Sequence, residues 1–97
     1  MTPNVALRLA ATFAFVGVIR PEYRRVNVEM DDSWITVRVV VDAPLSEDAE
    51  EQVSQAGTEI ISHFPEHMIQ EVIEVSTGAL APKDPINDAV IYQRWEA

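Results

Sequence analysis

Two histidines are the first residues in this sequence whose type and spacing could do chemistry. His63 and His67 are four apart, a spacing that places two imidazoles on one helical face, where they can bind zinc. Pro65 lies between them and is expected to break that helix, so the ligand geometry would not be fixed. The pair is therefore predicted to be two ordinary histidines at a helix end, and no metal site is expected.

Catalytic motifs are not visible elsewhere in the sequence. No serine lies in a G-x-S-x-G pattern, the three scattered glycines cannot build a phosphate-binding loop, and there is no cysteine. The carboxylate pairs at 31–32 and 50–51 fall in segments predicted to be solvated, where a general-acid role is not expected. Glu71 and His67 form no recognisable acid–base pair. The sequence therefore favours a binding protein over an enzyme, with no cofactor.

An acidic cluster is the chemical feature that remains. Residues 42–59 contain six carboxylates and no lysine or arginine. The cluster is either the solvated face of a helix or an anionic docking surface for a basic partner, and the sequence leaves both open. We take four of its members as candidate partner-binding residues: Glu47, Asp48, Glu50 and Glu51.

A second candidate surface lies on the outer face of a predicted β-hairpin. If the alternation of side chains is regular, Trp34 and Val40 are exposed there beside Arg25 and Arg38, and exposed tryptophan and arginine are typical interface anchors. The alternative is that a loop covers Trp34 at the edge of the sheet. Three residues from this region complete the list of candidate partner-binding residues: Asp31, Asp32 and Trp34.

The overall charge limits the partners that the chain can bind. Sixteen acidic and seven basic residues give a net charge of −9 in 97 residues. This charge repels nucleic acid and anionic membranes, and it favours a cationic protein. The length suits a single domain, residues 1–97. The absence of cysteine permits a reducing compartment, and the cytoplasm is the expected location.

The helices are predicted from their end signals and apolar residues. Thr2-Pro3 starts the first helix and Arg20-Pro21 stops it. Its apolar run, residues 5–19, is too short to cross a bilayer and is a poor signal peptide, so we expect a core helix covered on most of its circumference. Ser46 caps a second helix that begins at Glu47, buries one apolar stripe and ends at Phe64-Pro65.

The strands are predicted from residue alternation and branched side chains. Residues 23–30 and 34–41 form the hairpin, residues 68–76 a third strand, and residues 89–96 a fourth. The loop at 77–88 between the last two is long enough to suspect a functional role. The predicted class is α+β, with element order α-β-β-α-β-β and an antiparallel four-stranded sheet that carries both helices on one face.

Four segments resemble a group of small bacterial immunity proteins. The strings are RRVNVEMDD, WITVRVVVDAPLSEDAEEQ, EIISHFP and VIYQRWE. They combine a basic start to the first strand, an aspartate after the second, an acidic helix start, a Phe-Pro pair and a terminal Tyr-x-Arg. The group contains the immunity proteins of contact-dependent growth inhibition and related polymorphic toxin systems, and the likeness runs from about residue 20 to residue 96.

This resemblance implies a cytosolic inhibitor that binds the toxic C-terminal domain of a cognate effector, often a nuclease, without catalysis. No individual contact residue is transferred, because such families vary their contact surfaces to match different toxins. The alternative function is a small acidic adaptor or regulatory protein, dimeric through the hairpin face or the first helix. The sequence does not decide between a monomer and a homodimer.

Overall fold

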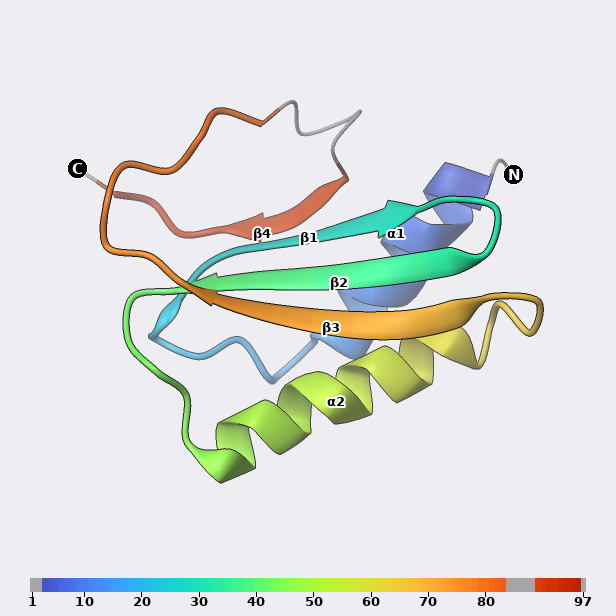
Figure 1. Ribbon diagram of the computed structural model, residues 1–97, viewed down its shortest axis with the longest axis horizontal. Helices are drawn as coiled ribbons and strands as arrows, with labels where there is room; N and C mark the ends of the chain where they lie inside the picture. The colour runs from blue at the N-terminus through green and yellow to red at the C-terminus, as the bar shows by residue number, and fades with distance from the viewer. Residues whose placement is uncertain (1–2, 84–88, 97) are drawn as a thin grey trace.

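Two helices and four strands follow one another along the chain (Figure 1). The computed structural model describes residues 3–83 and 89–96. The α+β class and the predicted element order are confirmed. The elements are α1 (Pro3–Ala14), β1 (Tyr23–Met30), β2 (Trp34–Val41), α2 (Glu47–Ile61), β3 (Met68–Val75) and β4 (Val90–Gln93).

The sheet is mixed, so the prediction of a purely antiparallel sheet was wrong. Its strand order is β3-β2-β1-β4, with β1 antiparallel to both β2 and β4. Strand β3 runs parallel to β2, and Met68 pairs with Trp34 at the start of both strands. The physical reason is α2, whose 15 residues span about 22 Å and carry the chain back along β2 before β3 begins.

The core lies between one face of the sheet and the two helices. Helix α2 contacts β3, α1 contacts β1 and β4, and the helices contact each other, with both on the same side of the sheet (Figure 1). This bears out the predicted layering. The alternating residues of β2 supply the centre of the core, and all four are fully buried: Ile35, Val37, Val39 and Val41.

Helix α2 begins where its local signals place it. The Ser46 hydroxyl accepts a hydrogen bond from the Ala49 N–H at 3.2 Å, which is the predicted N-cap. The helix ends at Ile61, slightly before the predicted stop. Gly57 is buried against β3, and a Cβ added there would collide with the Glu71 carboxylate. Helix and sheet therefore approach each other closely at this glycine.

Helix α1 is shorter and less covered than predicted. It ends at Ala14, before a turn in which Gly17 adopts a φ of 80°, a left-handed conformation that favours glycine. The expectation that most of its circumference is covered was wrong, since Phe13 and Val16 are each 70% exposed. Within the described residues, neither helix is long and apolar enough to span a membrane.

The segment between β3 and β4 changes the outer face of the hairpin. The predicted exposure of Arg25 and Val40 was wrong, because both are buried. The Arg25 guanidinium donates hydrogen bonds to the Ala81 carbonyl at 2.7 Å and to Gln93 at 3.0 Å, so residues 76–83 fold over this part of the sheet. The remainder of the predicted loop, residues 84–88, lies outside the described residues. Strand β4 covers only part of the predicted 89–96.

Candidate protein-binding surfaces

The first turns of α2 form an exposed acidic surface. The side chains of Glu47, Asp48, Glu50 and Glu51 line a shallow depression together with Ser54. Among the ion pairs of the described residues, none involves these four carboxylates. Their position at a helix N-terminus is favourable for negative charge, which offsets part of their mutual repulsion. We call these four residues the α2 acidic surface.

The hairpin turn holds the remaining candidate residues, and one of them has a structural role. The Asp31 carboxylate accepts hydrogen bonds from the backbone N–H groups of Ser33 at 2.9 Å and Trp34 at 2.7 Å. These bonds stabilise the charged form and lower the pKa of Asp31. Asp32 is exposed, and Trp34 is 38% exposed beside Met68. Asp31 therefore shapes the turn, while Asp32 and Trp34 are accessible.

The two groups of candidate residues lie at opposite ends of the molecule. Trp34 opens β2, whereas α2 begins after the last residue of that strand. Eight residues of β2 separate the two ends by about 23 Å, and Figure 1 shows the hairpin turn and the start of α2 on opposite sides. The structure thus forms two separate surfaces and does not unite the candidates in one site.

The two histidines make separate local contacts in the structure. His67 places its ring nitrogen 3.1 Å from the Asp31 carbonyl oxygen and packs edge-on against Phe64. His63 is exposed after the end of α2. In the described part of the chain, no group of three or more His, Cys, Asp or Glu residues is arranged to hold a metal ion.

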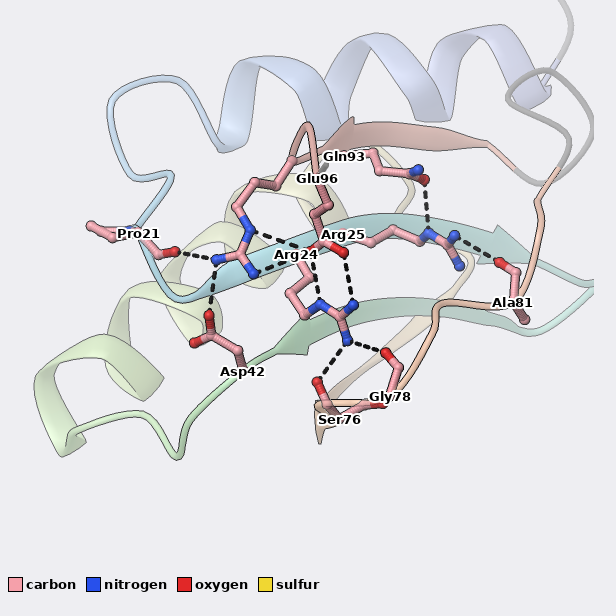
Figure 2. Close-up of polar contacts among 10 residues, drawn as sticks. Pro21, Arg24, Arg25, Asp42, Ser76, Gly78, Ala81, Gln93 and Glu96 are labelled. Carbon is pink, nitrogen blue, oxygen red and sulfur yellow. Dashed lines mark hydrogen bonds and ion pairs between the residues drawn. The ribbon is translucent and has the colours of Figure 1, made fainter.

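A network of charged residues at the start of β1 was not anticipated from the sequence. The guanidinium of Arg24, 6% exposed, donates two hydrogen bonds of 2.8 Å to the Glu96 carboxylate (Figure 2). It also donates to the carbonyls of Ser76 at 2.8 Å and Gly78 at 2.7 Å. Arg24 is the unpaired residue of a bulge between Tyr23 and Arg25. One buried arginine therefore ties together three segments that are distant in sequence.

Arg94 extends this network toward the end of β2. Its guanidinium donates to Asp42 at 2.9 Å and to the Pro21 carbonyl at 2.9 Å, and it also contacts Glu96 (Figure 2). Asp42 is thereby part of an ion pair, unlike the four carboxylates of the α2 acidic surface. We call Arg24, Asp42, Arg94 and Glu96 the C-terminal clamp, because they fix the last described residues against the sheet.

The chain matches a known protein family over nearly all of its length. The family description "MafI2 immunity protein" matches residues 4–96. The chain belongs to the MafI2 immunity protein family. The resemblance to immunity proteins of polymorphic toxin systems is confirmed, and membership implies toxin immunity through binding of a cognate toxin. No curated protein matches the sequence.

The C-terminal clamp contains several of the elements that carried the resemblance. The basic start of β1 supplies Arg24, the aspartate after β2 is Asp42, and the terminal Tyr-x-Arg supplies Arg94. In this member of the MafI2 family Asp42 binds Arg94, and Arg24 and Arg94 both bind Glu96, so these motif residues hold the fold together. The motifs were visible in the sequence, but their contact spans up to 72 positions and has no local signal.

Trp95 is an exposed residue that the sequence reasoning did not select. Its neighbours Arg94 and Glu96 are held in the clamp, while the indole is 86% exposed. Because Arg94 contacts Asp42, which lies shortly before α2, Trp95 lies at the same end of the molecule as the α2 acidic surface. The signal available in the sequence was only the residue type, since tryptophan is enriched at interfaces.

Glu96 makes the clamp sensitive to acid. Hydrogen bonding from Arg24 is the main cause that lowers the pKa of Glu96 from 4.5 to about 2. A carboxylate whose pKa is lower in the folded state than in the unfolded state stabilises the protein at pH values above the unfolded-state pKa. This stabilisation is lost as the pH falls from 4.5 to about 2. We expect the melting-temperature difference between the wild type and Glu96→Gln to be constant above about pH 5 and to shrink through that window.

Thermal melts of both proteins at several pH values test this expectation. Glu66→Gln is the matched control, because Glu66 is an exposed loop carboxylate that takes no part in the clamp. If the melting-temperature difference between the wild type and Glu96→Gln stays constant down to about pH 2, the ion pairs of Glu96 do not contribute to stability.

Proposed function

We propose that this chain neutralises the toxic C-terminal domain of a contact-dependent growth inhibition effector by stoichiometric binding, without catalysis. We further propose that the target is a basic domain with nuclease activity and that neutralisation takes place in the cytoplasm. Membership of the MafI2 immunity protein family supports the general function. The observation that carries the specific proposal is the α2 acidic surface, whose four carboxylates are exposed and outside the ion pairs of the described residues.

Charge complementarity connects this surface to a nuclease. A nuclease presents a cationic groove for the phosphates of its substrate. Four carboxylates on one helical turn and a half present closely spaced negative charges that can occupy such a groove, and the net charge of −9 increases the rate of encounter. The positive charges of the nuclease groove are then paired with these carboxylates and cannot hold the phosphates of the substrate.

Trp95 supplies the apolar part of the proposed contact. Interfaces are stabilised mainly by a few aromatic or arginine anchors, while the charged rim contributes more to the rate of association. Trp95 is 86% exposed and lies at the same end as the acidic surface. The hairpin residues Asp32 and Trp34 lie at the opposite end, so in this proposal they serve as a secondary contact that a toxin domain of sufficient size could reach.

Titration of nuclease activity tests the function directly. The proposed toxic domain is held at a fixed concentration, and this chain is added in increasing amounts. We expect inhibition to be complete at one chain per toxin domain. Loss of toxin activity at far smaller ratios would indicate enzymatic inactivation, and an absence of inhibition at excess would contradict the proposed function.

A further inference from the structure

Helix α1 carries an exposed apolar ridge on the side opposite to the core. Val5 and Leu9 are each 45% exposed and Phe13 is 70% exposed, whereas Leu7 and Ala11 on the other side are buried. Residues spaced by four lie along one line of a helix surface. We call Val5, Leu9 and Phe13 the α1 ridge; Val16 extends it beyond the end of the helix.

The ridge is suited to pairing with a copy of itself. Leu9 is its midpoint, so in an antiparallel pair of α1 helices Val5 of one copy lies opposite Phe13 of the other, with Leu9 near the two-fold axis. Rows of residues spaced by four form the most common class of helix packing in globular proteins. A hollow of about 260 Å³ adjoins the ridge and gives room for side chains of a second helix; it is lined by Ala6, Leu9, Ala10, Phe13, His63 and Phe64.

Charge favours a second copy over the basic toxin as the occupant of this ridge. All sixteen acidic residues lie after residue 21, and residues 1–21 contain Arg8 and Arg20 as their only charged side chains. Two molecules of net charge −9 repel each other, and the repulsion is weakest where neither presents a carboxylate. The ridge itself carries no acidic residue, and the carboxylate that lines a hollow beside Phe13 and Val16 is that of Glu59 on α2. One carboxylate at its margin is a weak match to a cationic domain.

The exposed apolar area of the ridge is that of a functional surface patch and supplies part of the area that an interface requires. Phe13 alone contributes on the order of 100 Å² of apolar area, because a phenylalanine covers 150–250 Å² when fully buried. With its neighbours the patch approaches the ~300–600 Å² that marks a functional patch on a monomer, and flanking residues of α1 and α2 extend it toward the ~800 Å² per partner of a standard interface. We propose that the α1 ridge is the interface between two copies of this chain.

Sedimentation of the purified chain tests self-association. We expect a dimer at concentrations of about 100 µM and dissociation on dilution toward about 1 µM. Phe13→Glu and Leu9→Glu should each shift the protein to monomer, with a dissociation constant at least ~100-fold weaker, since each places two charges in the interface. Val75→Glu is the matched control, because Val75 is 52% exposed on β3, and it should leave the dimer intact.

A cysteine at the midpoint of the ridge tests the geometry. The chain has no cysteine, so Leu9→Cys introduces a single thiol that should form an intermolecular disulfide on mild oxidation, whereas Val75→Cys should not. A wild type that stays monomeric throughout would overturn the proposal, as would equal crosslinking of both variants. Loss of toxin binding in Phe13→Glu with a monomeric wild type would assign the ridge to the toxin instead.

Discussion

Reversing the α2 acidic surface should weaken binding of the toxic domain by about 100-fold to 10,000-fold, because close charge pairs across an interface contribute several kcal/mol in total. The variant carries Glu47→Lys, Asp48→Lys, Glu50→Lys and Glu51→Lys. Each lysine repels a cationic groove, and the reversal also removes the electrostatic acceleration of association. The affinity is measured at several salt concentrations, and the steep decline expected for the wild type should be much flatter in the variant.

Two controls distinguish a loss of charge complementarity from a loss of folding. Lysines in the first turn of a helix oppose its dipole and cost roughly 0.3–1 kcal/mol each, so a thermal melt must show that the variant is folded. Glu66→Lys and Glu74→Lys change exposed carboxylates elsewhere and should alter the affinity only slightly. An unchanged affinity in the fourfold variant would show that the toxin binds another surface of this chain. It would not contradict the proposal that the chain neutralises the toxin.

Replacing Arg24 with methionine should lower the melting temperature by roughly 10 °C, since the four hydrogen bonds of a buried guanidinium are lost at once. The change leaves the Glu96 carboxylate without its two 2.8 Å bonds and the Ser76 and Gly78 carbonyls without their donor. Arg24→Lys keeps the charge, but an ammonium cannot reproduce the forked geometry, so an intermediate loss is expected.

The matched control for this prediction is Arg38→Met. Arg38 pairs with Glu29 at 3.6 Å, and both side chains are partly exposed, so its loss should change the melting temperature by no more than about 2 °C. Equal effects of the two substitutions would show that the C-terminal clamp contributes no more than a surface ion pair. Below its melting temperature, Arg24→Met should still bind toxin through the α2 acidic surface, but with lower affinity, because Trp95 precedes Glu96, which has then lost its Arg24 partner.

Local signals were sufficient where a structural feature depends on residues close in sequence. The start of α2 follows from Ser46 and the first-turn acids, because a cap and a helix dipole act within about one turn. The hairpin follows from residue alternation in 23–30 and 34–41, which gives β1 and β2 their buried faces. The exposure of Glu47, Asp48, Glu50 and Glu51 follows from the buried stripe on the other side of the same helix.

Only the tertiary structure decided the features that depend on contacts between distant segments. The pattern of β3 does not reveal which strand it joins, and its parallel pairing with β2 results from the return path through α2. Arg25 and Val40 have the alternation of an exposed face, yet both are buried, and Arg25 is bonded to the Ala81 carbonyl of the segment after β3. The C-terminal clamp and the exposure of the α1 ridge also depend on segments that are distant in sequence. The type of a side chain determines its chemistry, whereas its burial and its pairing depend on which remote segment packs against it.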